Sequence, residues 1–269
     1  MSVSGVGSSS ASHLASLRTQ QTTTLAQVSS GRRISRAGVD PAGAAIVAEL
    51  DTEAASQRAA VRNANDGMSV LETAEGAAGS TVDALQRIRE LAVQASSGTI
   101  NASQRSLIQR EVDELVDQID SQADSTEFNG LKLADGSRGS IDVQTGTGSG
   151  DQTSVGLIDL RSSTLGIDGI DLTSAASAQA ALDDIDSALD DVNAGRSGLG
   201  ASHNRLASAV AYGEQAALNT EAASASIGDT DFIQAFIDRS NQSVQQEANI
   251  FAMAQSRNMN RVAVLGLLG

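Results

Sequence analysis

Few side chains in this sequence could take part in catalysis or hold a metal ion. There are two histidines, His13 and His203, and no cysteine, which removes disulfides, thiolate nucleophiles and sulfur ligands. No H-E-x-x-H motif is present, so the zinc site of that motif is absent. His203 falls on an apolar helical seam, where packing is the expected role. We therefore predict no catalytic residue, no metal ligand and no cofactor.

Two other local patterns also favour structural roles. The stretch from Gly146 to Asp151 is glycine-rich, as phosphate and calcium loops are, but it lacks the following lysine of the first and the repeated acidic residues of the second. A turn is therefore predicted there. Asn101-Ala-Ser103 and Asn241-Gln-Ser243 match the acceptor pattern for N-glycosylation. Whether these sites or exposed hydroxyls are modified stays open at this stage.

Composition narrows the class of protein. The chain has 269 residues, 33 acidic against 18 basic side chains, a net charge of -15 and 2% aromatic residues. No run of 18 apolar residues exists, so we expect no membrane span, and residues 1–12 lack the features of a cleavable signal peptide. We expect no nucleic-acid partner, since binding nucleic acid requires clustered basic residues. Scarce aromatic residues argue against a thick globular core and favour helices packed closely over Ala and Ser.

The charge is distributed unevenly along the chain. Residues 1–39 contain four arginines and no acidic residue, whereas residues 40–228 contain 29 acidic and 11 basic side chains. The acidic central part should stay soluble, and copies of it should repel one another because they carry the same charge. The two ends carry little net negative charge, so this repulsion does not prevent them from packing on another surface.

Hydrophobic spacing predicts two long helices. Asp40 and Pro41 can cap and begin a helix that Gly98 ends. Its apolar residues recur at steps of three and four, and the same spacing predicts a second helix over residues 176–228. At 1.5 Å per residue the first helix would be roughly 85 Å long, which predicts a rod. Gly76 and Gly79 mark a place where it could kink.

Shorter elements are predicted between the two long helices. Asn101 and Gln104 resemble a capping box for a helix over residues 102–122. Residues 127–172 then change to short alternating runs, with strands predicted at residues 131–133, 141–143 and 155–160 and turns at 135–137 and 146–151. This part should form small hairpins rather than a domain of its own.

Both ends of the chain carry amphipathic stripes but are poorly helical alone. One stripe runs over Leu14, Leu17, Gln21, Thr24 and Val28, and the other is longer. The longer stripe comprises Val244, Ala248, Phe251, Gln255, Met259, Val262 and Leu265. Isolated helices of this kind are marginal in water. We predict that residues 1–40 and 229–269 are disordered in the monomer and fold on one another only within an assembly, while residues 41–228 form a stable helical rod domain.

Several motifs in this order resemble those of the bacterial flagellins, and the similarity covers nearly the whole chain. They occur at both ends and in the middle, which makes them more specific together than any one alone. The stretches are VSSG at 28–31, DPAGAAI at 40–46, RNANDG at 62–67, QRIRELAV at 86–93, FNG at 128–130, LGA at 199–201, NRL at 204–206 and FAMAQ at 251–255. Arg32 departs from the family pattern, which usually has Leu or Gly there. The variable outer domain of many flagellins is absent.

The resemblance implies a fold and a function. The fold is mainly α: a long antiparallel helical rod or coiled-coil bundle with a small β-hairpin region, and terminal helices that pair as an inner coiled coil. The function is that of a structural subunit, not an enzyme, which polymerises into the extracellular flagellar filament used for swimming. Implied partners are further copies of the chain, the flagellar cap and hook-junction proteins and an export chaperone. Passage through the flagellar type III apparatus would explain the missing signal peptide.

The resemblance also implies roles for particular residues. Arg87, Leu91 and Glu111 match the family positions that a flagellin-sensing host Toll-like receptor contacts, although they could equally form an inter-subunit surface. The C-terminal stripe, including Phe232, Phe236, Phe251 and Leu268, matches the tail that export chaperones bind. Packing in the filament core is expected from Leu14, Leu17, Val28, Val244, Phe251, Met259, Val262 and Leu265.

Two rival interpretations remain. The hook–filament junction protein shares the terminal pattern, but the central stretches at 86–93 and 128–130 are flagellin-like. A non-flagellar coiled-coil adaptor or type III needle component would differ in length and in the terminal pairing pattern. Long filaments of the purified chain would favour flagellin over both.

Overall fold

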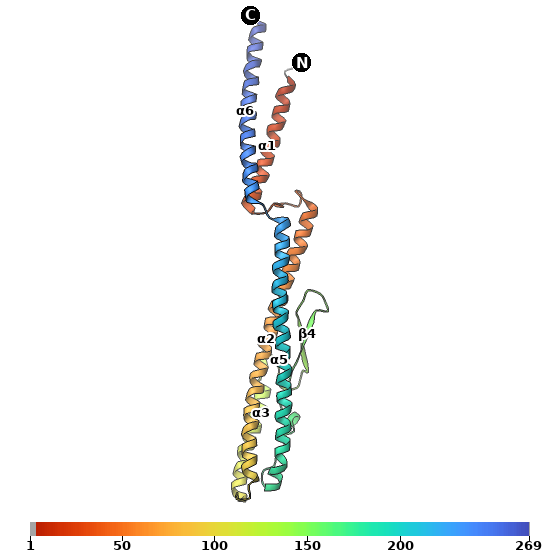
Figure 1. Ribbon diagram of the computed structural model, residues 1–269, viewed down its shortest axis with the longest axis vertical. Coiled ribbons are helices and arrows are strands. Elements are labelled where there is room, and N and C mark those ends of the chain that lie inside the picture. Colours follow the sequence, from red (N-terminus) through yellow and green to blue (C-terminus); the bar gives the residue numbers. More distant parts are fainter. Residues whose placement is uncertain (1–3, 269) are drawn as a thin grey trace. The chain divides into compact units, whose positions relative to one another are not determined.

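The computed structural model describes the backbone of residues 4–268 and the side chains of residues 12–255, 257, 258, 261 and 262. Within that part the chain forms six helices and two small pairs of strands, in agreement with the predicted mainly α fold (Figure 1). The helices are α1 (Ser4–Ser30), α2 (Pro41–Ser96), α3 (Ala102–Ser125), α4 (Ser162–Leu165), α5 (Ala175–Gly228) and α6 (Phe232–Leu268). None of these described helices is long and apolar enough to cross a membrane.

The chain divides into two compact units, described separately below. Unit 1 comprises residues 1–52 and 219–269, and unit 2 comprises residues 53–218. Both boundaries fall inside the long helices α2 and α5. The division predicted from the sequence, with disordered arms beyond residues 40 and 229, concerns the behaviour of the monomer and stays a prediction.

In unit 2, α2 and α5 lie side by side and run in opposite directions (Figure 1). Arg89 of α2 pairs with Asp186 of α5 at 2.6 Å, and Glu75 pairs with Arg196 at 2.7 Å. Numbers that rise along α2 therefore fall along α5, which makes the pair antiparallel. Helix α2 continues without a break through Gly76 and Gly79, the place where the sequence allows a kink.

Local hydrogen bonds explain where these helices begin and end. The Asp40 carboxylate accepts from the Gly43 amide at 2.9 Å at the start of α2. At its end, the Arg105 guanidinium donates to the carbonyl oxygens of Ala95 and Ser97, which lie at the negative end of the helix dipole. The capping box predicted at the start of α3 is present, with Asn101 and Gln104 bonding each other's backbone amides.

Two hydrophobic clusters form the interior of unit 2. The larger joins α2, α3 and α5 with residues 160–172, and its fully buried members include Leu85, Ile88 and Ile185. The smaller joins α2 and α5 with the strands, through Leu71, Val143 and Leu206 among others. Much of the buried surface belongs to alanine, so the helix backbones approach closely without aromatic side chains.

Two short hairpins follow α3. Strands β1 (Glu127–Phe128) and β2 (Leu131–Lys132) are joined by Asn129 and Gly130, whose φ angles of 50° and 78° suit a tight two-residue turn. Strands β3 (Ser140–Gln144) and β4 (Gln152–Gly156) flank the predicted turn at 146–151. The predicted strand at 155–160 was wrong in extent. Pairing ends at Gly156, because the following side chains, including Leu157 and Leu160, pack into the two clusters instead.

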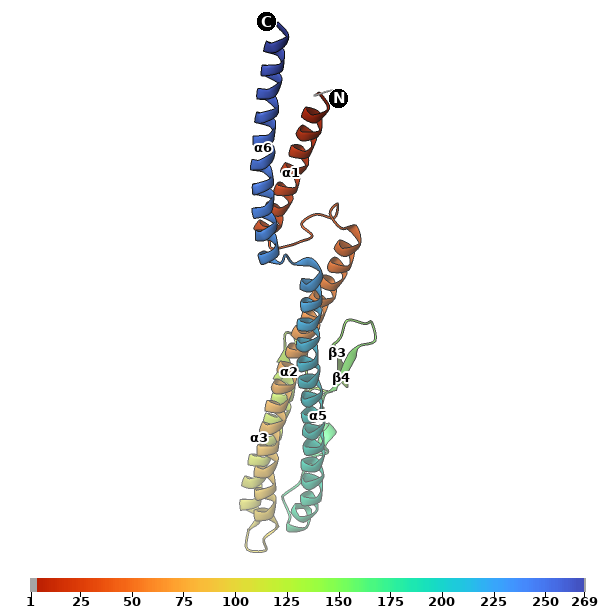
Figure 2. The same cartoon turned by 45° about the horizontal axis from the view of Figure 1, so that its top comes forward.

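In unit 1, α1 and α6 lie side by side (Figure 2). The segments that lead into them are bonded to each other: Arg33 donates its amide to the Gly228 carbonyl oxygen at 2.7 Å, and Thr230 donates to Gly31 at 2.9 Å. The end of α1 is thus held beside the start of α6, so these two helices are also antiparallel.

Candidate functional site

The helix pair of unit 1 is the first place where predicted functional residues gather. On α1, Leu17 is 2% exposed and Thr24 is 8% exposed, while Leu14, Gln21 and Val28 are half-buried. This is the stripe identified in the sequence, and in the single chain it is the face that α1 turns toward α6.

Helix α6 meets α1 through a face that the sequence did not single out. Its buried or half-buried residues recur at steps of seven, four, three and four, and they are Ala235, Gln242, Gln246, Asn249 and Met253. The spacing is helical, but four of the five residues are small or polar and only Met253 is a large apolar residue, so a search for apolar stripes passes over this face.

The predicted apolar stripe of α6 points away from α1. Val244 is 63% exposed, Phe251 is 74% exposed and Val262 is 70% exposed. Phe232 and Phe236, expected in the chaperone-binding tail, are also exposed. The side chains of Met259, Leu265 and Leu268 lie outside the described residues. A soluble chain seldom exposes so many large apolar side chains along one helix unless another molecule covers them.

The three residues matched to receptor recognition occupy two environments in unit 2. The Arg87 guanidinium donates to Glu111 Oε1 at 2.8 Å and to Glu90 Oε2 at 3.1 Å, and all three side chains are exposed. Hydrogen bonds from Arg87 to Glu111 and then to Glu90 raise the pKa of Arg87. Leu91 is instead only 3% exposed, in the larger cluster. The structure therefore brings Arg87 and Glu111 together and places Leu91 in the interior.

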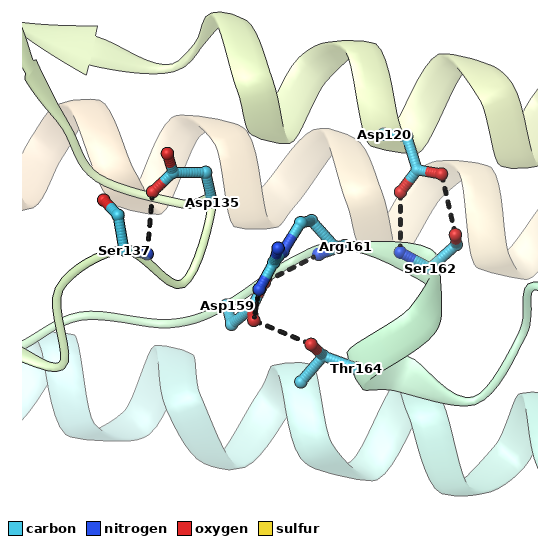
Figure 3. Close-up of polar contacts among 7 residues, drawn as sticks. All are labelled: Asp120, Asp135, Ser137, Asp159, Arg161, Ser162 and Thr164. Atoms are coloured by element: carbon cyan, nitrogen blue, oxygen red, sulfur yellow. Dashed lines mark hydrogen bonds and ion pairs between the residues drawn. The ribbon is translucent and has the colours of Figure 1, made fainter.

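A network of charged and hydroxyl side chains, which no sequence motif predicted, holds the irregular segment after β4 (Figure 3). Asp159 accepts from the Arg161 guanidinium at 2.7 Å and from the Thr164 hydroxyl at 2.7 Å. The bond from Arg161 is the main reason that the pKa of Asp159 falls to about 2. Nearby, Asp120 of α3 accepts from both the amide and the hydroxyl of Ser162, each at 2.7 Å. These contacts are satisfied within the chain, so they indicate a structural role.

Neither histidine lies in an arrangement suited to catalysis. His13 is exposed on α1, and His203 is half-buried at an open cavity of about 300 Å³ between α2 and α5, beside the Glu75–Arg196 ion pair. Among the described residues, no three His, Asp or Glu side chains lie close enough together to hold a metal ion.

Comparison with known proteins accounts for this combination of satisfied polar contacts and an exposed apolar helix. Two family models match, the bacterial flagellin N-terminal helical region over residues 6–138 and the bacterial flagellin C-terminal helical region over residues 182–268. A flagellin of Halalkalibacterium halodurans is 36% identical over 244 residues, which are 90% of this chain and 89% of the relative. The chain belongs to the bacterial flagellin family. The resemblance seen in the sequence is thereby confirmed, and the chain is a structural subunit of the flagellar filament.

Other relatives agree with this flagellin assignment. A flagellar filament core protein of Brachyspira hyodysenteriae is 34% identical over 256 residues, covering 89% of this chain and 90% of the relative. The crystal structure of Bacillus cereus flagellin has a TM-score of 0.52 and 32% identity, covering 56% of this chain and 88% of that one. A flagellar hook-associated protein of Vibrio parahaemolyticus has a TM-score of 0.60 at 16% identity, covering 71% of this chain and all of that one, and shows the shared fold alone.

Proposed function

We propose that neighbouring subunits of the filament cover the exposed apolar stripe of α6. The observation that carries the proposal is the outward orientation of Val244, Phe251 and Val262 in the single chain, while α6 meets α1 through small and polar residues. Apolar area of this kind contributes about 25 cal/mol per Å² when it leaves water. A subunit whose own fold leaves this area exposed obtains that free energy only when it assembles with other copies.

Charged substitutions on the two faces of α6 test this proposal. Val244→Asp places a carboxylate in the covered stripe and should raise the critical concentration for polymerisation at least tenfold, since burying an unpaired charge costs several kcal/mol. Ser243→Asp makes the same change of charge on the adjacent exposed residue and should leave polymerisation nearly unchanged. Equal critical concentrations for the two variants would contradict the proposal.

The same stripe supports a role in export. We propose that Phe232, Phe236, Phe251 and Leu268 bind an export chaperone before assembly, because an apolar helix face needs a cover in the cell. The chain would then pass unfolded through the flagellar type III apparatus to the cell exterior. Deleting residues 230–269 should abolish chaperone binding and polymerisation together. A truncated chain that still polymerises would contradict the shared role of this segment.

Receptor recognition is also proposed for Arg87, Leu91 and Glu111. Arg87 and Glu111 form an exposed ion pair, whereas Leu91 is only 3% exposed in the single chain. Arg87→Ala monomers should lose most signalling through a flagellin-sensing Toll-like receptor. Arg110→Ala removes another exposed arginine nearby on α3 and provides the matched control. Unchanged signalling by Arg87→Ala would refute the assignment.

No catalytic activity is proposed for this chain, whose partners would be its own copies, the flagellar cap and the hook-junction proteins. Negative-stain microscopy of the purified protein in salt distinguishes the filament subunit from the two alternatives, a hook–filament junction protein and a coiled-coil adaptor. Long filaments are expected of a flagellin. Short plugs would instead indicate a hook–filament junction protein, and dispersed particles an adaptor.

A further inference from the structure

The open cavity between α2 and α5 of unit 2 has an apolar floor and a charged rim. Its volume of about 300 Å³ is at the lower end of the range for binding pockets, which suits a single large side chain rather than a length of chain. The floor includes Leu71 and Leu199, each 2% exposed, and the rim includes Glu72, His203 and the Glu75–Arg196 ion pair. The cavity therefore combines apolar surface with charged groups that can bond a polar atom.

The groups around the cavity match the chemistry of a phenol side chain. The Arg196 guanidinium is held to Glu75 Oε1 through its edge, with Nε at 2.9 Å and Nη2 at 2.7 Å. A guanidinium bonded at its edge can still stack a planar face on an aromatic ring. The exposed Glu72 carboxylate can accept a hydrogen bond from a hydroxyl. An aromatic ring with a hydroxyl at its tip thus complements both the floor and the rim.

Unit 2 carries one such side chain on its own surface. Tyr212 of α5 is the only tyrosine of the chain and, at 77% exposed, the most exposed large apolar side chain among the described residues. It follows His203 by nine residues, or two and a half helical turns, so it points to the opposite side of α5. A helical polymer requires two different, complementary patches on each subunit, because its contacts continue head to tail from copy to copy. Tyr212 and the cavity are placed as such a pair.

We propose that Tyr212 of one subunit inserts into the cavity between α2 and α5 of a neighbouring subunit in the filament. Its ring packs on Leu71 and Leu199 and stacks on Arg196, and its hydroxyl donates to Glu72. Between parallel copies, this contact displaces neighbours by about 20 Å along α5, because about 12 residues separate Tyr212 from the middle of the cavity. The contact involves unit 2 alone, so it is independent of the role proposed for the exposed stripe of α6.

Tyr212 reports its own burial, because the chain has one tyrosine and no tryptophan. Acrylamide should quench tyrosine fluorescence strongly in dilute monomer and several-fold less in filaments. Tyr212→Ala should raise the critical concentration for polymerisation about tenfold, as expected of an interface anchor. Leu107→Ala removes another exposed apolar side chain of unit 2 and should leave the critical concentration nearly unchanged. Equal quenching in monomer and filament, or an unchanged critical concentration for Tyr212→Ala, would overturn the proposal.

Cross-linking identifies the surface that Tyr212 contacts. The chain has no cysteine, so Tyr212→Cys chains and Glu72→Cys chains can be copolymerised above their critical concentration and treated with a short bismaleimide. Cross-linked dimers are expected from these mixed filaments, but not from either variant alone or from the dilute mixture. Glu214 is exposed, two residues from Tyr212 and toward the other side of α5, so Glu214→Cys mixed with Glu72→Cys should give no dimer. Protection of Tyr212 from acrylamide without a cross-link to residue 72 would show that it packs elsewhere, and would overturn its assignment to the cavity.

Discussion

In unit 2, the irregular segment between β4 and α5 is held to helix α3 by hydrogen bonds from single side chains, not by strand pairing. Gln109 of α3 donates to the Ile170 carbonyl oxygen at 2.9 Å and accepts from the Leu172 amide at 2.6 Å. Asp120, also of α3, accepts from the amide and the hydroxyl of Ser162. None of these contacts could be predicted from the sequence. Each joins residues more than 40 positions apart, and no local pattern of residue types marks them.

Asp159 gives the clearest prediction at this scale. Its folded pKa of about 2 lies below its ordinary value near 4, so its contribution to stability is complete above pH 4 and lost as the pH falls toward 2. Asp159→Asn should lower the free energy of unfolding by about 1–2 kcal/mol at pH 7, and the melting temperature by about 2–8 °C. The two proteins should melt alike at pH 2.

Thermal unfolding followed by circular dichroism at both pH values checks this expectation. Asp142→Asn removes an exposed carboxylate of β3 that makes no ion pair among the described residues, and it should change little. A deficit for Asp159→Asn that persists at pH 2 would show that the carboxylate charge is not its cause.

The helices themselves were largely predictable because their signals are local. Asp40, Pro41 and Gly98 bracket α2, and the Asn101–Gln104 box marks the start of α3. The orientation of α6 was not predictable from its apolar stripe. Within one chain the smaller, more polar face packs on α1 and the stripe stays exposed, which is the outcome expected if other copies of the chain cover it, as proposed above. The extent of β4 was missed because the apolar residues that follow it, Leu157, Ile158 and Leu160, are as apolar as strand residues but pack into the two clusters without pairing.

Two glycines in the long helices should respond oppositely to alanine. A Cβ at Gly76 would have no neighbour within 4 Å, whereas a Cβ at Gly213 would lie 2.7 Å from Val61 Cγ2. Both substitutions gain about 1 kcal/mol of helix propensity. Gly76→Ala should keep that gain and raise the melting temperature by about 2–4 °C. Gly213→Ala should lose it to overpacking.

Melting curves of the two variants provide the comparison, with each serving as the control for the other. Equal stabilisation by both would mean that α2 and α5 are not in close contact at this level.

The net negative charge lies almost entirely on unit 2, whereas most of the exposed large apolar side chains lie on unit 1. Unit 2 carries 25 acidic and 11 basic side chains, a net charge of -14, whereas unit 1 carries 8 and 7. The exposed apolar stripe of α6 belongs to unit 1. The few aromatic residues and abundant alanine reflect close packing between helices within each unit, and the proposed function assigns the exposed apolar area of α6 to contacts between copies.

Repulsion between copies of unit 2 predicts a dependence of assembly on salt. The critical concentration for polymerisation should fall steeply as NaCl rises toward 1 M, where charges are screened within about 3 Å. Replacing Asp183, Asp184, Asp190 and Asp191 with Asn removes carboxylates that make no ion pair among the described residues, and it should lower the salt requirement. Sedimentation of filaments at graded NaCl concentrations measures both. A critical concentration that rises with salt would contradict the role given to this charge.

Hydrogen exchange of the arms tests the central claim, that the chain completes its fold by assembling. Residues 12–30 and 232–255 should exchange their amides rapidly in dilute monomer, while α2, α3 and α5 of unit 2 stay protected. In filaments the same arms should become protected to a comparable degree. Full protection of the arms in dilute monomer, unchanged on assembly, would contradict the account.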